Sequence, residues 1–270
     1  MRYLSSGACA VAFALASVLP ALSETFADKV SVRVLPGWQE KDGSFVAALD
    51  VHLAKGWKTY WRAPGEAGLP PVFSWGGSEN VQGVQVIWPR PDVFYQNGLR
   101  TIGYKERLVL PLRVLPGQSG GQVALGGTVE MGICEDVCVP LTVTLPPVEL
   151  SQNTRRVPDI AAALAERPFA ARSAGVGGVS CTVAPEGRNL VLTTTIEMPA
   201  LSGQEVVVVE PGDATIWVRD SVSRRDGDRL VTRTELMDAN GGAFALDRSA
   251  LRLTVLGDAR AVEIDGCSGS

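Results

Sequence analysis

Short apolar segments separated by turn residues run along most of the chain, and this pattern predicts strands rather than helices. Segments such as 45–53 (FVAALDVHL) and 139–145 (VPLTVTL) are rich in β-branched residues, and Gly, Pro, Asp and Asn punctuate them. The first series of expected strands comprises 30–35, 45–53, 84–88, 108–115, 129–133 and 139–145. The second series comprises 179–183, 190–198, 205–210, 215–220, 230–238, 251–256 and 261–264.

One segment between the two series has a different pattern. Residues 158–166 (PDIAAALAE) are typical of a short helix, because proline suits the first helical turn and Pro168 follows the end. Ser, Asn and Gly around this segment are typical of a linker. The predicted fold class is therefore all-β, with two immunoglobulin-like β-sandwich domains at 24–150 and 176–270. A linker at 151–175, which carries the short helix, joins them.

The first residues have the organisation of a secretory signal peptide. Arg2 supplies a positive charge, residues 8–22 are apolar without a charge, and Ala21-Leu22-Ser23 fits a small-residue cleavage site. The apolar run is shorter than the roughly 20 residues of a membrane-spanning helix. We therefore predict a signal peptide at 1–23, cleaved near Ser23, and an exported protein without stable membrane insertion.

Charge and histidine content exclude several classes of function. The chain has 25 basic and 29 acidic residues, with a formal net charge of −4 and no basic block. Nucleic acid and anionic lipid are therefore not expected as partners. His52 is the single histidine, which argues against a histidine-rich metal site and against a Ser-His-Asp triad. No nucleotide, flavin or haem motif is evident, so no cofactor is expected.

Export changes the interpretation of the cysteines. Four lie beyond the predicted signal peptide, namely Cys134, Cys138, Cys181 and Cys267, and an even number in an oxidising compartment indicates disulfides. Three pairings are possible, and spacing favours Cys134 with Cys138 and Cys181 with Cys267. Because bonded cysteines need Cα atoms within about 7 Å, residues 135–137 must turn, as a hairpin loop or a single helical turn.

The two expected disulfides differ in what they contribute to stability. Closing a loop of about 87 residues between Cys181 and Cys267 stabilises the fold by roughly 4.6 kcal/mol in the chain-entropy model. A loop of about 5 residues contributes only about 2 kcal/mol in the same model. The long-range bond is therefore interpreted as structural, and the short bond has the features of an exchanging disulfide.

Three interpretations of the short cysteine pair stay open from the residues alone. They are redox exchange, a structural clip, and a metal site in which Met131 joins Cys134 and Cys138 as ligands of Cu(I). The acidic neighbours Glu135 and Asp136 are expected to raise the thiol pKa values by like-charge repulsion. We therefore expect a relay or reductant rather than a strong oxidant.

Four segments together resemble a known family. They are 56–70 (GWKTYWRAPGEAGLP), Phe94-Tyr95, 104–111 (YKERLVLP) and 132–140 (GICEDVCVP). They resemble the amino-terminal periplasmic domain of the thiol:disulfide interchange protein DsbD, and the tryptophan-rich first segment is most similar to the suppressor-of-copper-sensitivity protein B type. The resemblance covers most of residues 30–150 and extends more loosely to the rest.

This resemblance implies a periplasmic protein-disulfide reductase with an immunoglobulin-like redox domain. In that family, the cysteine pair receives electrons from a membrane-embedded transporter and passes them to thioredoxin-fold proteins. By resemblance, Cys138 is the cysteine attacked to form the mixed disulfide, and Cys134 resolves it. The chain of 270 residues contains neither the transporter nor a thioredoxin-like domain, so the electron donor is expected to be a separate protein.

The resemblance also implies a cap over the disulfide. The family's cap loop corresponds to Asp92-Val93-Phe94-Tyr95, in which Phe94 would cover the disulfide and exclude solvent and wrong partners. Tyr60 corresponds to a tyrosine of the family's site region and Asp92 to a nearby acid. Val93 departs from the DsbD pattern, which has a second acid there.

Two rival functions use the same residues. The first is a copper-binding or copper-tolerance module that holds Cu(I) through the thiolates. The second is a non-redox adaptor in which Cys134–Cys138 is a permanent clip. The first rival predicts stoichiometric Cu(I) binding by the reduced protein, and the second predicts a disulfide that resists mild reductant.

Overall fold

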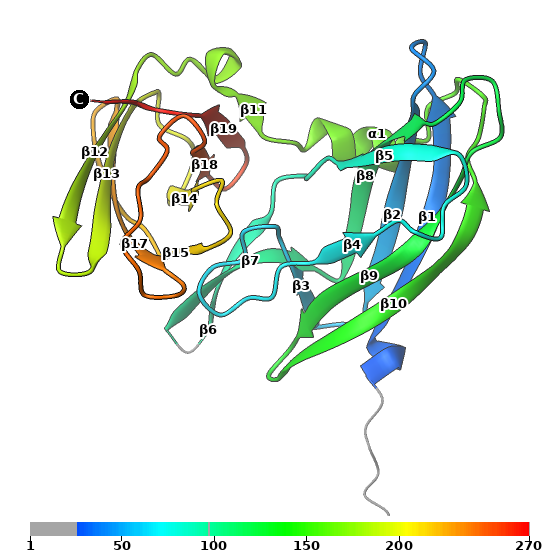
Figure 1. The fold of residues 1–270 in the computed structure, drawn as a ribbon, viewed down its shortest axis with the longest axis horizontal. Coiled ribbons are helices and arrows are strands. Elements are labelled where there is room, and N and C mark those ends of the chain that lie inside the picture. Colours follow the sequence, from blue (N-terminus) through cyan, green and yellow to red (C-terminus); the bar gives the residue numbers. More distant parts are fainter. Residues whose placement is uncertain (1–25, 97, 270) are drawn as a thin grey trace, which may run out of the picture.

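The computed structural model describes residues 26–96 and 98–269, so the predicted signal peptide at 1–23 lies outside the described residues. Strands dominate the described chain, which confirms the predicted all-β class. Figure 1 shows two groups of strands, with the earlier part of the chain on the right and the later part on the left. No helix among the described residues is long and apolar enough to cross a membrane.

Within the described residues, the earlier strands form two sheets, which we call the N-terminal sheet pair. One has the order β1-β2-β8-β5, and the other has the order β10-β9-β3-β7-β6 with β4 also paired to β9. A short 3-10 helix, η1 (Phe26–Lys29), precedes them. The strands are β1 (Val30–Gln39), β2 (Phe45–Leu53), β3 (Lys58–Tyr60), β4 (Val72–Ser74), β5 (Val81–Val86), β6 (Asp92–Gln96), β7 (Leu99–Lys105), β8 (Arg107–Pro116), β9 (Ala124–Cys134) and β10 (Cys138–Glu149).

The later strands form the C-terminal sheet pair. Its sheets have the orders β11-β19-β18-β14 and β15-β17-β13-β12-β20, with β16 paired to β17. A 3-10 helix, η2 (Ala171–Ala174), follows the first of these strands. The strands are β11 (Phe169–Ala170), β12 (Val179–Glu186), β13 (Asn189–Glu197), β14 (Val206–Glu210), β15 (Ile216–Val218), β16 (Val222–Asp226), β17 (Arg229–Asp238), β18 (Arg252–Leu256), β19 (Ala261–Asp265) and β20 (Ser268–Gly269).

Strand β2 contributes apolar side chains to buried clusters on both of its faces. Phe45, Leu49 and Val51 alternate on the face that packs into the large core between the two sheets. Val46 and Ala48, on the other face, pack with Trp38 and Ile160. Strand β2 is therefore buried on both faces, which explains why its sequence is an almost continuous apolar run.

The predicted helix is present as α1 (Pro158–Ala165), with proline at its first turn. Ile160 is fully buried against β2 and Trp38, so the helix is packed on the N-terminal sheet pair rather than suspended between the two groups. In Figure 1 it lies at the junction of the two groups of strands. The helix thus covers an outer face that β2 would otherwise expose.

The two sheet pairs meet in a shared apolar and ionic contact. Val206, Leu256 and Ala261 of the C-terminal pair belong to the same buried cluster as the N-terminal core. Beside this cluster, Arg62 donates hydrogen bonds to Glu210 at 2.8 and 3.0 Å and to Glu263 at 2.6 Å. The domain boundaries near residues 150 and 176, and the immunoglobulin-like topology, stay predictions.

Asp50 is a buried charge on the outer side of the N-terminal pair. Its side chain is fully buried and lies 2.7 Å from Arg33, 2.9 Å from Arg107 and 3.0 Å from His52. Burial alone would raise the pKa of Asp50, but the hydrogen bonds from these three side chains outweigh it and lower the pKa to about 2. The single histidine therefore has a structural position, in line with its place in a predicted strand.

Candidate functional site

The short cysteine pair closes a β-hairpin. Strand β9 ends at Cys134, β10 begins at Cys138, and the two residues are direct partners in the antiparallel register. They form a disulfide, with Cα atoms 4.1 Å apart. This is the close spacing of an antiparallel pair without mutual backbone hydrogen bonds, so the N–H and C=O of Cys138 point away from β9. Of the two turns that the spacing allowed, the hairpin is the one observed.

The two sulfur-bearing residues differ in their exposure. Cys134 is 4% exposed, whereas Cys138 is exposed at the start of β10, which is at the edge of its sheet among the described strands. Val137, at the tip of the hairpin, is 65% exposed. Cys138 is therefore the residue of the pair that is open to solvent, whereas Cys134 is buried.

The predicted acidic neighbours lie in the exposed hairpin loop. Glu135 and Asp136 are both exposed. The Glu135 side chain lies next to Gly56, which precedes β3. A Cβ atom placed on Gly56 would lie only 2.6 Å from the Oε1 atom of Glu135. Gly56 also has a φ of +87°, which favours glycine. The carboxylate of Glu135 therefore lies near the start of β3.

Tyr60 places its hydroxyl on the exposed cysteine. The ring is buried, and Oη lies 3.0 Å from Cys138 Sγ, where the phenol must be the donor because a disulfide sulfur carries no proton. Burial raises the pKa of Tyr60, so the hydroxyl stays protonated. A Cβ atom on Gly132 would lie 2.9 Å from the Tyr60 ring and from Leu69 Cβ, so glycine there is what lets the ring lie flat across β9.

The predicted cap segment is a strand rather than a loop. Residues 92–96 form β6, which pairs with β7, because Val93, Phe94 and Tyr95 favour strands and Gly98 supplies the turn with a φ of +79°. Asp92 is exposed and ion-pairs with Arg90 at 3.4 Å. The strand therefore belongs to the same sheet as the cysteine hairpin, three strands away from β9.

Phe94 lies on the disulfide face of this strand and contacts ammonium groups. Its ring is 9% exposed, and its centre lies 4.6 Å from Lys105 Nζ and 5.5 Å from Lys58 Nζ. Both distances are in the range of cation–π contacts. That the Phe94 ring itself covers the disulfide stays a prediction.

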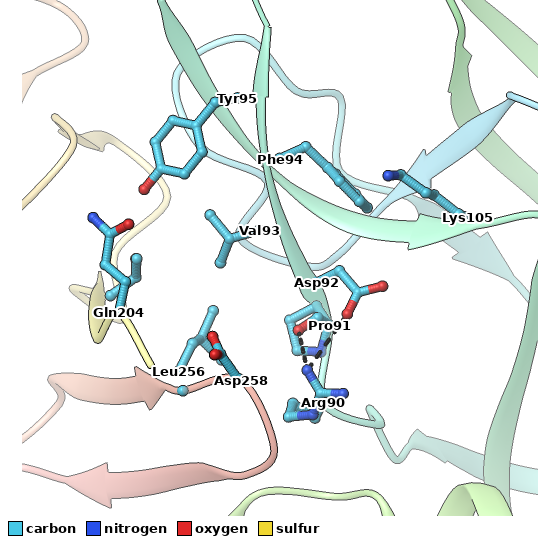
Figure 2. A pocket seen from close by; sticks show the side chains of 12 residues that line it. Arg90, Pro91, Asp92, Val93, Phe94, Tyr95, Lys105, Gln204, Leu256 and Asp258 are labelled. Atoms are coloured by element: carbon cyan, nitrogen blue, oxygen red, sulfur yellow. Dashed lines mark hydrogen bonds and ion pairs between the residues drawn. The ribbon is translucent and has the colours of Figure 1, made fainter. Parts of the chain in front are cut away.

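A pocket of about 430 Å³ lies behind the cap strand, where β6 faces the C-terminal sheet pair. Figure 2 shows Val93 and Tyr95 on this side and Phe94 turned away from it, as strand alternation requires. The opposite wall includes Leu256 and Asp258. The pocket thus separates part of the predicted cap strand from the C-terminal sheet pair.

Sequence reasoning missed two lysines beside the disulfide. In the register of the sheet, Lys58 of β3 is the direct partner of Cys134 on one side and of Lys105 on the other. Burial of Lys58 and the positive charge of Lys105 lower the pKa of Lys58. Both lysines lie within motifs that carried the family resemblance, but only the register of strands far apart in sequence makes Lys58 the partner of both Cys134 and Lys105.

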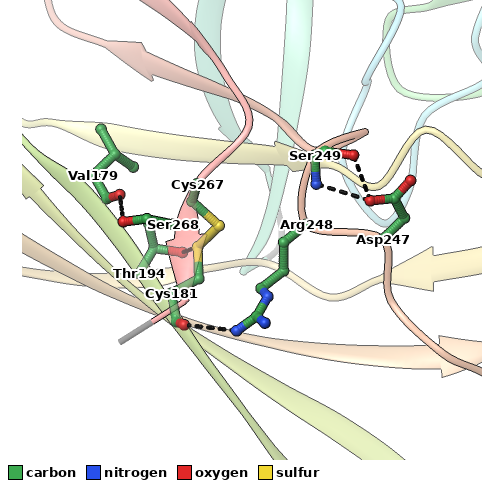
Figure 3. The surroundings of a disulfide bond; sticks show 8 residues. All are labelled: Val179, Cys181, Thr194, Asp247, Arg248, Ser249, Cys267 and Ser268. Atoms are coloured by element: carbon green, nitrogen blue, oxygen red, sulfur yellow. Dashed lines mark hydrogen bonds between the residues drawn. A yellow bond between two sulfur atoms is a disulfide. The ribbon is translucent and has the colours of Figure 1, made fainter.

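The second disulfide has a different environment. Cys181 in β12 is fully buried, and its Sγ lies 3.7 Å from Thr194 Oγ1 of the neighbouring strand. Figure 3 shows the bond to Cys267, which is followed by Ser268, and the Ser268 hydroxyl donates to the carbonyl of Val179 at 2.9 Å. The Cα atoms of the two cysteines are 5.8 Å apart. This bond ties the last described strand to the first long strand of the C-terminal pair.

The geometry removes one predicted metal ligand. Met131 belongs to the buried core, and alternation along β9 puts it on the face opposite to Cys134. Met131 therefore cannot complete the Cu(I) site proposed from the sequence. Among residues 26–96 and 98–269, no group of three or more His, Cys, Asp or Glu side chains could hold a metal ion.

The fold and the site define an all-β protein with an accessible disulfide at the tip of an edge hairpin. Comparison with known families agrees: residues 31–149 match the family described as thiol:disulfide interchange protein DsbD, N-terminal. The predicted resemblance to that domain is therefore confirmed over residues 31–149. No protein with a curated description matches the chain in sequence.

A solved structure extends the likeness of fold beyond that segment. The N-terminal periplasmic domain of ScsB from Proteus mirabilis is similar with a TM-score of 0.68 and 24% sequence identity. The match covers 90% of this chain and 94% of the ScsB structure. The similarity of fold thus includes the C-terminal sheet pair, which the family match does not reach.

Proposed function

We propose that this protein is a periplasmic thiol–disulfide exchange protein that acts through Cys134 and Cys138. The observation that carries the proposal is the asymmetry of the pair, in which Cys138 is exposed and Cys134 is buried. Exchange needs one sulfur that a partner can reach and a second sulfur held next to it. The match of residues 31–149 to the DsbD amino-terminal family supports the same reaction.

The protein is reduced in two exchange steps. A donor thiolate attacks Cys138 Sγ, the bond between the two cysteines breaks, and Cys134 leaves as a thiolate. The donor's second thiolate then attacks the donor sulfur of the mixed disulfide, and Cys138 leaves. The donor dithiol has become a disulfide, two electrons have moved to Cys134 and Cys138, and solvent supplies the protons.

The protein then reduces a client by the reverse sequence. The Cys138 thiolate attacks the client disulfide, and one client sulfur leaves as a thiolate. The Cys134 thiolate attacks Cys138 Sγ, which re-forms the disulfide of this protein and releases the second client thiolate. The Tyr60 hydroxyl, 3.0 Å from Cys138 Sγ, is placed to donate a hydrogen bond to the charged sulfur in both sequences.

The partners follow from the resemblance. We expect the electron donor to be a membrane electron transporter of DsbD type, acting in trans, and the client to be a periplasmic thioredoxin-fold protein. The hairpin fits such a client, because the N–H and C=O of Cys138 face the open edge of the sheet and can pair with an extended segment of the partner.

The test is exchange with a reduced or oxidised thioredoxin-fold protein. Replacing Cys138→Ser should abolish exchange, whereas Cys134→Ser should trap a mixed disulfide through Cys138, because the resolving thiolate is missing. Cys181→Ser with Cys267→Ser serves as the matched control and should retain exchange in the protein that remains folded. Exchange by Cys138→Ser at the parent rate would contradict the proposed roles.

A further inference from the structure

Two largely buried arginines of the N-terminal sheet pair bind acidic side chains of the C-terminal sheet pair. The Arg62 side chain is 17% exposed and donates hydrogen bonds to Glu210 of β14 at 2.8 and 3.0 Å and to Glu263 of β19 at 2.6 Å. The Arg100 side chain is 12% exposed and lies 3.0 Å from Asp220. Because Arg62 binds Glu210 through two nitrogens and is shielded from water, this contact is firmer than an ordinary surface ion pair.

The charges around Arg62 are balanced. Glu263 also lies 3.9 Å from Arg252, so the two carboxylates that bind Arg62 are close to two guanidinium groups. Burial would lower the pKa of Arg62, but the hydrogen bonds and charges of Glu210 and Glu263 outweigh burial and raise the pKa. Arg62 therefore stays charged and bound to both carboxylates.

Both arginines are close in sequence to the backbone that positions Tyr60. Tyr60 is the last residue of β3, and its register partner is Gly103 of β7. Arg62 follows Tyr60 by two residues, and Arg100 precedes Gly103 by three residues in the same strand. On its other side, β3 pairs with β9 through its first two residues. Tyr60 thus lies at the end of a short paired segment, and the C-terminal sheet pair holds the chain just beyond it.

Trp61 connects the bound arginine to Tyr60. The Arg62 guanidinium lies over the Trp61 ring, 4.4 Å from the ring centre. Trp61 is fully buried, and its backbone N–H donates to the carbonyl of Ile102 in β7 at 3.0 Å. Because Tyr60, Trp61 and Arg62 are consecutive, the ion pairs of Arg62 restrict the backbone that carries the Tyr60 ring.

The hydrogen bond from Tyr60 is sensitive to position. Its hydroxyl lies 3.0 Å from Cys138 Sγ, and a hydrogen bond weakens steeply as its length and angle depart from the preferred values. A small displacement of the end of β3 would therefore weaken the contact that supports a Cys138 thiolate.

We propose that Arg62 is a positioning residue through which the C-terminal sheet pair keeps the Tyr60 hydroxyl at Cys138 Sγ. The C-terminal sheet pair then contributes to the redox site through Glu210 and Glu263. This inference rests on the proposed function for the use of Tyr60, but the position of the hydroxyl is a property of the protein alone.

The experiment measures the Cys138 thiol without any partner. In the mature Cys134→Ser variant, with Cys181–Cys267 closed, the pH dependence of alkylation by iodoacetamide gives the pKa of Cys138. Adding Arg62→Met should raise this pKa by about half a unit, because the hydrogen bond from Tyr60 to the thiolate weakens.

The glutamates separate positioning from a direct effect of charge. Removing a positive charge would by itself raise the pKa of a thiol, whereas removing negative charges would by itself lower it. Positioning predicts instead that Glu210→Gln combined with Glu263→Gln raises the pKa of Cys138, as Arg62→Met does. The glutamine side chains have the shape of the glutamates they replace, so this variant also decides the case in which Arg62→Met does not fold.

Two further variants test the route and the specificity. If Arg62 acts through the phenol, Arg62→Met should add no further shift in the pKa of Cys138 to that of Tyr60→Phe. Arg225→Met is the matched control, because the Arg225 side chain is 19% exposed and binds Glu205 within the C-terminal sheet pair at 2.6 Å. This control should leave the pKa of Cys138 unchanged.

Three results would overturn the inference. They are an unchanged pKa of Cys138 in the folded Arg62→Met variant, an unchanged or lowered pKa in the double glutamine variant, and shifts of Arg62→Met and Tyr60→Phe that add. An equal shift in Arg225→Met would overturn it as well. A protein that shows the predicted shifts but exchanges with no thioredoxin-fold partner would refute the proposed function and leave the inference standing.

Discussion

The two disulfides of this protein differ in almost every physical property. Cys134–Cys138 spans four positions and closes a hairpin at a sheet edge, with one cysteine exposed. Cys181–Cys267 spans 86 positions, and Cys181 is fully buried. Loop length and burial make the second bond a contributor to stability and leave the first available for chemistry.

The contrast extends to the polar groups around each bond. The short bond has a phenol at Cys138 Sγ, and Lys58 of the neighbouring strand β3 is the register partner of Cys134. The long bond has the hydroxyl of Thr194 at 3.7 Å from Cys181 Sγ, and Arg248 donates a hydrogen bond to the backbone carbonyl of Cys181 at 3.5 Å (Figure 3). The phenol at the short bond therefore contacts a sulfur that carries charge in the proposed exchange, whereas the Arg248 contact at the long bond is made to a backbone carbonyl.

The largest expected difference is in stability. Replacing both Cys181 and Cys267 by Ser should lower the free energy of unfolding by about 4–5 kcal/mol. Replacing both Cys134 and Cys138 by Ser should lower it by about 2 kcal/mol or less, because the closed loop is short. Urea denaturation of the two double variants at pH 7 measures both values. Equal losses in the free energy of unfolding would contradict the assignment of one bond to stability and the other to exchange.

The next prediction concerns the stability of the N-terminal sheet pair in acid, which depends on Asp50. The pKa of Asp50 is about 2 in the folded state and near 3.9 in the unfolded chain, so its stabilisation is complete above about pH 4. It is lost as the pH falls from about 4 toward 2, and amounts to roughly 2 kcal/mol. Asp50→Asn should therefore be less stable at pH 7 and should lose less stability across this pH window.

Denaturation midpoints at pH 7, 4 and 2.5 measure this effect. Asp28→Asn is the matched control, because its side chain is 67% exposed and forms an ion pair with the neighbouring Lys29. The control should follow the parent at each pH. If Asp50→Asn and the parent lose the same stability between pH 4 and 2.5, the buried carboxylate does not control acid unfolding.

The smallest expected effects come from removing one hydroxyl group beside each disulfide. Tyr60→Phe should raise the pKa of the Cys138 thiol by about half a unit to one unit and slow its exchange, because a hydrogen bond to the thiolate is lost. Thr194→Val, beside Cys181, should leave the exchange rate of the short pair unchanged. Both should change the free energy of unfolding by about 1 kcal/mol or less. Identical exchange rates in Tyr60→Phe and the parent would remove Tyr60 from the mechanism.

The spacing of residues in the sequence was enough to predict the pairing of the two disulfides and the fold class. Two cysteines four positions apart between apolar strands require a turn, and the structure contains it as the β9–β10 hairpin. The two ends of the Cys181–Cys267 bond could be paired by elimination once the hairpin was assumed. The fold class followed from the same alternation of apolar and turn residues.

The detail of the site depended on contacts that local spacing does not encode. Strand β3 has only three residues, too few for a period to be read, and it pairs with Cys134 across 76 positions of sequence. Exposure of Cys138 and burial of Cys134 follow from the place of β10 at the sheet edge. The cap was expected as a loop, although its Val93-Phe94-Tyr95 sequence favours the strand observed.

The most direct test of the account is a redox titration of the mature protein in glutathione and dithiothreitol buffers. Thiols are trapped at each potential, and mass spectrometry reports the state of each cysteine. The account predicts that Cys134–Cys138 opens reversibly in the folded protein while Cys181–Cys267 stays closed. If both bonds stay closed until the protein unfolds, the short disulfide is a structural clip and the central claim is wrong.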